Sequence, residues 1–135
     1  MRLREVTVVR DPSDTRPYVL TGDQVTVRAE YEASRAVSGV AFQLEVRGNE
    51  ILLFRTDTDI LGVKGDLPAG PGWVEFVLGS VPFADGEYEV CVGIETPQGQ
   101  SDWREPACKF EVMNPWRSTG IVTIPVTSSI GSLSP

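Results

Sequence analysis

The stretch Val81-Pro-Phe-Ala-Asp-Gly-Glu-Tyr-Glu-Val-Cys-Val-Gly-Ile-Glu95 decides the fold class. After the Asp85-Gly86 turn, its apolar residues fall on alternate positions: Tyr88, Val90, Val92 and Ile94. Successive side chains of a β-strand point to opposite faces, so these four would share one face. Charged and small residues fill the positions between them. The pattern predicts a strand that buries one side in a core.

The same two-residue alternation recurs along the chain, with turn residues between the runs and almost no helical periodicity. We expect strands within residues 3–9, 25–31, 40–47, 51–58, 73–78, 87–95 and 108–113, and an eighth strand at 121–127. Residues 59–72 would form the longest loop, and residues 97–103 a shorter one. The sequence therefore predicts an all-β protein, an immunoglobulin-like antiparallel β-sandwich of about eight strands.

The C-terminal part of the chain differs from the rest. We expect a sandwich domain in residues 1–113, a linker and final strand of the same domain in 114–127, and a frayed tail in 128–135. The final strand would consist of Ile121, Val122, Ile124, Pro125 and Val126. Proline cannot donate a backbone hydrogen bond, so Pro125 excludes a central place in a sheet. A separable strand after a linker is what exchange between the protomers of a dimer requires.

Composition excludes several classes of function. The 135 residues carry a formal net charge of -7, which argues against nucleic acid and anionic membranes as partners. There is no histidine, which removes imidazole-based triads and metal sites. The two cysteines lack CxxC spacing. We expect no metal, no cofactor and no nucleic acid.

Cys91 and Cys108 also bear on the cellular compartment. Cys91 is out of phase with Val90 and Val92, whereas Cys108 is in phase with the apolar face of its own strand. If the two strands pair, the thiols point to opposite faces and cannot form a disulfide. Two free thiols suit a reducing compartment, so we expect a cytoplasmic domain.

The outward positions offer candidates for ligand binding. Long planar donors and acceptors are predicted on the outer side of neighbouring strands: Arg28, Glu30, Gln43, Glu45, Arg47, Arg55 and Glu89. Such groups can hydrogen-bond sugar hydroxyls, and an aromatic ring can pack against the C–H groups of a pyranose. Trp73 and Trp103 are the aromatic candidates; the alternative for each is that it fills an end of the core. A phosphorylated or acidic glycan would need Arg28, Arg47 or Arg55.

Several stretches together resemble a known family. They are Val40-Ala-Phe-Gln-Leu-Glu-Val-Arg-Gly-Asn-Glu-Ile-Leu-Leu-Phe-Arg-Thr-Asp-Thr58, Gly72-Trp-Val-Glu-Phe-Val-Leu78, residues 81–94, Phe110-Glu-Val112 and Gly120-Ile-Val-Thr-Ile-Pro125. In this order they are similar to the polysaccharide-binding C-terminal domain of the ATPase subunit (Wzt type) of bacterial O-antigen ABC exporters. The family has asparagine where Asp57 stands here, which leaves the fold expectation intact and bears on the ligand at that loop.

The resemblance implies a domain without catalytic activity. It would bind the terminal portion of a lipid-linked O-antigen polysaccharide in the cytoplasm, at the periphery of the inner membrane, for export by the ABC transporter. Its partners would be the ATPase domain, the membrane subunit and a second copy of the chain that exchanges the last strand. Walker motifs are absent from the sequence, so nucleotide hydrolysis would belong to the ATPase domain.

Two other classes of function stay open from the residues alone. The chain could be a protein-interaction or structural sandwich that docks through an edge strand. Alternatively, Glu45, Glu89 and Glu95 could act as paired carboxylates in glycoside hydrolysis, which would make the protein an enzyme. Binding of a glycan without turnover is the prediction that we carry forward.

Overall fold

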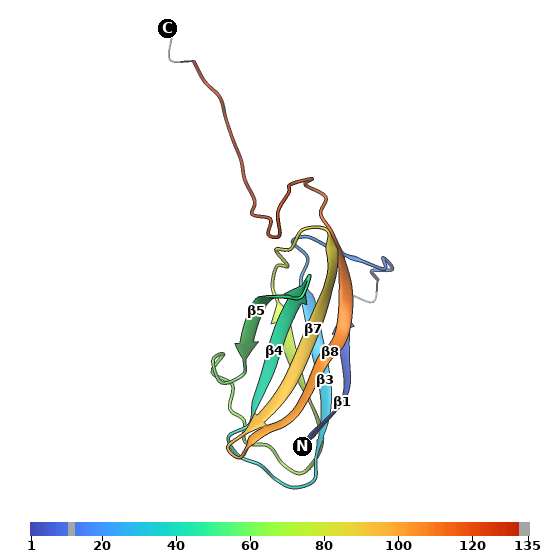
Figure 1. Cartoon of the computed structure of the whole chain (residues 1–135), viewed down its shortest axis with the longest axis vertical. Coiled ribbons are helices and arrows are strands. Elements are labelled where there is room, and N and C mark those ends of the chain that lie inside the picture. Colours follow the sequence, from blue (N-terminus) through green and yellow to red (C-terminus); the bar gives the residue numbers. More distant parts are fainter. Residues whose placement is uncertain (11–12, 133–135) are drawn as a thin grey trace.

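The computed structural model describes residues 1–10 and 13–132, and within them every regular element is a strand. The eight strands form two facing sheets (Figure 1). Their bounds are β1 Arg2–Val9, β2 Val19–Leu20, β3 Val25–Ala33, β4 Ala41–Gly48, β5 Ile51–Asp57, β6 Gly70–Leu78, β7 Gly86–Thr96 and β8 Gly99–Met113. One sheet has the order β1-β3-β6 and the other β2-β8-β7-β4-β5. The predicted all-β sandwich of about eight strands is confirmed.

The core lies between the sheets and consists of the alternating residues that the sequence predicts. In β3, the inward positions Val25, Val27 and Ala29 are all buried, while the positions between them are not. In β7, the apolar positions of the opening stretch are buried in the same core. Tyr31 and Phe42 join the two sheets, with ring centroids 5.0 Å apart. Burial of this continuous apolar layer is the main stabilising contribution.

Two strand boundaries and one strand differ from expectation. The short strand β2 pairs in parallel with the end of β8 and was not predicted, because two residues are too few to show a period. Strand β8 begins at Gly99, so residues 99–103 belong to a strand and not to a loop. Strand β6 begins at Gly70, two residues before the predicted end of the long loop. A Cβ atom on Gly72 would lie 2.4 Å from the ring of Tyr31, so the glycine makes room for this core side chain.

The two thiols are free, as predicted. Val90 pairs with Cys108 across β7 and β8, which places Cys108 on the inward side of the sheet and Cys91 on the outward side. Cys108 packs against the core, whereas Cys91 is fully buried beneath side chains of the outer face. Both thiols therefore lie in a sheet whose thickness separates them.

The segment after β8 folds back on its own chain before it extends away (Figure 1). The side-chain amide of Asn114 donates to Ser118 Oγ at 2.8 Å and to Thr123 Oγ1 at 3.2 Å. The amide of Thr123 donates to the Pro82 carbonyl at 2.6 Å. Residues up to Thr123 are thus held against residues 82–84.

Residues 121–127 do not form the expected eighth strand within the single chain. In the described residues, the segment makes one isolated bridge, between Phe83 and Val122. Ile124 and Val126 are 72% and 82% exposed, respectively. Exchange of this segment between protomers stays a prediction. The last three residues of the predicted tail, 133–135, lie outside the described part of the chain.

Candidate functional site

The predicted site residues divide between the two sheets. Trp103 and five of the polar candidates lie on the five-stranded sheet: Gln43, Glu45, Arg47, Arg55 and Glu89. Arg28, Glu30 and Trp73 lie on the three-stranded sheet. The expectation that all of them share neighbouring strands is therefore wrong. The chain crosses from one sheet to the other between β3 and β4, so the outward residues of these two strands face opposite sides of the molecule.

The outer face of the five-stranded sheet carries its polar residues in cross-strand rows. In one row, Asp57, Gln43, Gly93 and Trp103 follow one another across β5, β4, β7 and β8. In the next row, Arg55, Glu45 and Cys91 are neighbours. Directly opposed residues on one face have Cβ atoms about 5 Å apart, within reach of a hydrogen bond between long side chains. We call this surface the Trp103 face.

Gln43 is the centre of an amide network on this face. Its side chain belongs to a residue that is only 5% exposed, although it stands on the outer side of the sheet. Gln43 Nε2 donates to Glu95 Oε2 at 2.8 Å, and Gln43 Oε1 accepts from Gln100 Nε2 at 2.9 Å. Both ends of the buried amide are thereby satisfied, which holds Glu95 and Gln100 in place.

Glu45 is the centre of a second, ionic network. The residue is 3% exposed and accepts from Arg47 Nη2 at 2.7 Å and Arg47 Nε at 3.0 Å. Arg55 Nη1 lies 3.4 Å from its other oxygen, and Arg47 also pairs with Glu105. The hydrogen bonds to Glu45 raise the pKa of the Arg47 guanidinium above its ordinary value. The carboxylate is therefore buried as a paired charge, with its hydrogen bonds made.

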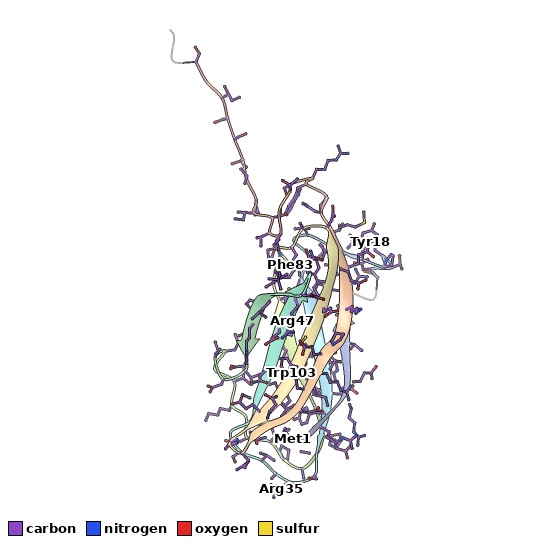
Figure 2. The ribbon with its side chains drawn as sticks, viewed as in Figure 1. Met1, Tyr18, Arg35, Arg47, Phe83 and Trp103 are labelled. Atoms are coloured by element: carbon purple, nitrogen blue, oxygen red, sulfur yellow. The ribbon has the colours of Figure 1, made fainter. Side chains whose placement is uncertain are left out.

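Trp103 lies in the centre of this face (Figure 2). A Cβ atom on Gly93 would lie 2.5 Å from the Trp103 ring atom Cε3, so the indole occupies the space that the glycine leaves. The indole Nε1 donates to Glu105 Oε2 at 3.3 Å. The residue is half-buried, and no cation or second aromatic ring within the described residues stacks on its ring. Trp103 does not plug the core; it lies on the outer surface of the sheet.

Trp73 has different surroundings on the three-stranded sheet. It is 58% exposed, and the guanidinium carbon of Arg28 lies 4.7 Å from the centroid of its ring. The same arginine is 3.3 Å from Glu75 Oε1 and 3.7 Å from Glu30 Oε1. A cation over an aromatic ring occupies the surface that a sugar would use. Arg28, Glu30 and Trp73 thus form a small surface cluster of their own.

Sequence reasoning missed three contributors to the Trp103 face. Gln100 and Glu105 were not among the candidates, because the start of β8 was expected to be a loop. Gly93 was noted only as a small residue between core positions. Pairing residues 87–95 directly across the tight turn at Thr96-Pro-Gln-Gly99 would have placed Trp103 opposite Val92; a register shift between Ile94 and Glu95 places it opposite Gly93 instead.

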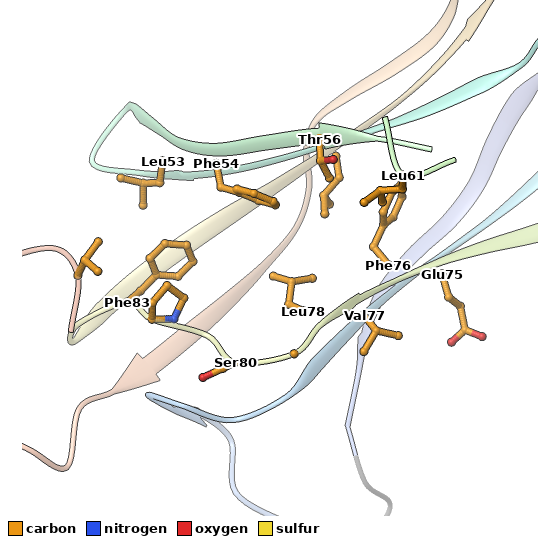
Figure 3. A pocket seen from close by; sticks show the side chains of 14 residues that line it. Leu53, Phe54, Thr56, Leu61, Glu75, Phe76, Val77, Leu78, Ser80 and Phe83 are labelled. Atoms are coloured by element: carbon orange, nitrogen blue, oxygen red, sulfur yellow. The ribbon is translucent and has the colours of Figure 1, made fainter. Parts of the chain in front are cut away.

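A separate apolar groove opens between the edges of the two sheets. It has a volume of about 470 Å³ and is lined by β5, β6 and the segment that follows β6. Figure 3 shows Leu53 and Phe54 on one side and Leu78 and Phe83 on the other. Val122, from the C-terminal segment, also lines the groove.

The described residues include no helix with the length and apolar character needed to cross a membrane.

The profile of the Wzt C-terminal domain family matches residues 2–124, which is nearly the whole chain. The chain belongs to the Wzt C-terminal domain family. This family is associated with O-antigen ABC exporters, in which it is a non-catalytic substrate-binding domain. The resemblance inferred from the ordered motifs is thereby confirmed.

Solved structures agree with this assignment at the level of the fold. The crystal structure of the C-terminal domain of Wzt superposes with a TM-score of 0.82 at 16% sequence identity, over 97% of this chain and 83% of the other. A Niemann-Pick type C2 protein from the Japanese carpenter ant superposes with a TM-score of 0.55 at 12% identity, over 83% and 90%, respectively. No significant match is found among curated protein sequences.

Proposed function

We propose that this domain is a non-catalytic carbohydrate-binding module that holds the terminal portion of an O-antigen polysaccharide on the Trp103 face, for export by an ABC transporter. The observation that supports it best is the seating of Trp103 on Gly93, between the Gln43 and Glu45 networks. An indole beside ordered carboxylates and amides offers an apolar surface for sugar C–H groups and acceptors for sugar hydroxyls.

The two networks order this surface before any ligand arrives. Gln43 and Glu45 are buried and fully hydrogen-bonded, so their partners have little freedom to lose when a sugar binds. Binding free energy that is not consumed by ordering side chains appears as affinity. The face is nevertheless open and wet, which suits affinities in the micromolar to millimolar range.

The Arg28 cluster is the weaker of the two candidate faces. Binding of a sugar to the Trp73 ring would have to displace the guanidinium that lies over it. No such displacement is needed at Trp103. The roles of Arg28, Glu30 and Trp73 in glycan binding stay predictions, and Trp73 provides a matched comparison for Trp103.

The partners follow from the family. Its association with ABC exporters supports binding next to an ATPase domain and a membrane subunit, on the cytoplasmic side of the inner membrane. The exposed apolar residues Ile124 and Val126, with Pro125 between them, support a homodimer in which this segment pairs with the other protomer.

An NMR titration of the isotope-labelled domain tests the proposal. The ligand is O-polysaccharide from the organism that encodes the chain, and an unrelated polysaccharide is the control. We expect shift changes confined to Trp103, Gln43, Glu89 and their neighbours, lost in Trp103→Ala and kept in Trp73→Ala. Loss in Trp73→Ala alone would move the site to the other sheet. No shift change in the folded wild-type domain would refute glycan binding.

The apolar groove supports a second candidate, a protein-docking sandwich. It lies between the edge strands β5 and β6, and the exposed Phe54 of β5 extends it to the surface. An edge strand with apolar neighbours can accept a strand from another chain. In this case a charged substitution in the groove, such as Phe54→Lys, would abolish partner binding, whereas Trp103→Ala would not.

A further inference from the structure

We propose that the glycan residue bound on the Trp103 face is uncharged, and that the face discriminates against sugars that carry phosphate or carboxylate groups. The inference rests on the proposed function and concerns the class of sugar. It is argued from the state of each charged group on this face.

Each cation of the face is already paired with a carboxylate. Arg47 contacts Glu45 and Glu105, and Arg55 contacts Glu45. Lys109, in the same cross-strand row as Arg47 and Glu89, lies 3.6 Å from Glu87 and 3.9 Å from Glu89. An anionic sugar would have to compete with these carboxylates for every one of the three cations.

Arg104 is next to Trp103 in sequence, but its side chain is hydrogen-bonded to the backbone of β1. Its guanidinium donates to the backbone carbonyl of Leu3 at 2.5 Å and to that of Arg4 at 3.2 Å. It therefore joins β8 to β1 at the edge of the sandwich and does not face the ring of Trp103.

Two carboxylates near Trp103 are exposed, although one of them, Glu105, also pairs with Arg47. Glu95 is exposed and makes no ion pair among the described residues; its interaction is the hydrogen bond from the Gln43 amide. Glu105 is 42% exposed by its side chain and accepts from the indole Nε1. Carboxylates accept hydrogen bonds from hydroxyl groups and repel anions. The ring is thus flanked by negative acceptors that favour a neutral, hydroxyl-rich sugar.

Lys64 is a cation near this face that makes no ion pair within residues 1–10 and 13–132. Lys64 lines a neighbouring cavity of about 430 Å³, between the loop after β5 and the turn after β7, together with Asp59 and Glu95. An anionic glycan would be expected to use Lys64, because this cation would not have to leave a carboxylate partner. A substitution of Lys64 therefore tests whether the bound glycan is anionic.

The direction in which each substitution changes the glycan affinity distinguishes a neutral sugar from an anionic one. Binding of the source organism's O-polysaccharide is measured by NMR titration with the wild-type domain, Glu95→Gln, Glu105→Gln and Lys64→Gln. For a neutral sugar, each glutamine variant at 95 and 105 should weaken binding about three- to ten-fold through the loss of a charged acceptor, and Lys64→Gln should bind like the wild type. Raising the salt concentration should leave the affinity nearly unchanged.

The opposite signs would overturn the inference. An anionic sugar predicts tighter binding by Glu95→Gln and Glu105→Gln, weaker binding by Lys64→Gln and a marked loss of affinity in salt. In that case Trp103→Ala would still abolish binding, so the proposed function would stand. A wild-type domain that binds no glycan would remove both the proposed function and this inference.

Discussion

The indole of Trp103 rests directly on Gly93, the residue opposite to it across β7 and β8. An aromatic side chain on the outside of a sheet usually lies across its neighbours' side chains. Here the indole occupies the space that is left because Gly93 has no side chain. The ring is therefore close to the backbone, beside the hydrogen-bonded pair Gln43 and Gln100, whose polar atoms would also collide with a Cβ atom on Gly93.

Adding a methyl group at this glycine should displace the indole. We expect Gly93→Ala to lower the free energy of unfolding by about 1–3 kcal/mol, because the methyl group overpacks a filled space. It should also shift the tryptophan fluorescence spectrum and abolish glycan binding. Urea unfolding and fluorescence measure these effects. Gly79→Ala is the control, since a Cβ atom there meets nothing within 4 Å. Equal stability of the two variants would contradict the packing of Trp103 against Gly93.

The buried carboxylate of Glu45 should be important for stability. Glu45→Gln retains the volume but removes the charge that pairs with Arg47 and Arg55, and we expect a loss of about 1–3 kcal/mol in the free energy of unfolding. Arg55→Gln removes one partner that is 54% exposed by its side chain, so its effect should be below about 1 kcal/mol. Urea unfolding of both variants measures which substitution lowers the free energy of unfolding more. A larger loss for Arg55→Gln would show that the carboxylate is not the centre of the network.

Removal of the exposed C-terminal residues should separate dimerisation from folding. Thr123 is bonded to the Pro82 carbonyl, whereas Ile124 and Val126 are exposed. We expect deletion of residues 124–135 to convert the predicted strand-exchanged dimer into a folded monomer, with urea unfolding showing an intact sandwich. Analytical ultracentrifugation measures the mass. A 135-residue chain that remains monomeric as its concentration is raised would contradict the exchange.

The half-buried thiol of Cys108 should make the fold sensitive to alkaline pH. Burial raises the pKa of this thiol from 9.0 to about 11. The unfolded chain therefore loses the proton first, so the free energy of unfolding should fall as pH rises from about 9 to about 11. Burial also raises the pKa of Tyr31 and Tyr88, which adds to the same trend. Cys108→Ala should make this decline shallower in urea unfolding at several pH values; an unchanged slope would contradict the assignment.

Strand identity was predictable where the alternation is long. Val25, Val27 and Ala29 repeat over enough positions to show which side is buried, and the structure confirms it. The start of β8 was missed because residues 99–105 are polar and lie between prolines, so their composition is typical of a loop. These residues form a strand because they pair with β7, and the residue pattern of one strand alone does not reveal its pairing partner.

The candidate site was predictable only in part. Outward phase correctly placed Gln43 and Glu45 on an outer face, whereas Trp103 was chosen as an aromatic residue of an expected loop; phase also suggested one face for residues that belong to two. Phase also implies exposure, whereas Gln43 and Glu45 are almost fully buried by the long side chains around them. Arg28 was a plausible anion ligand by type, yet its guanidinium lies over Trp73 and beside Glu75.

The amino-acid sequence by itself determined which side of each long strand enters the core, since the two-residue period is a local property that burial then enforces. It also determined the family, through motifs that recur in a set order. Only the tertiary structure decided which outward residues are neighbours, because membership of a sheet depends on how the chain crosses between layers. The pairing of Trp103 with Gly93, and of Glu45 with two arginines, exists only after β4, β5, β7 and β8 have assembled in register.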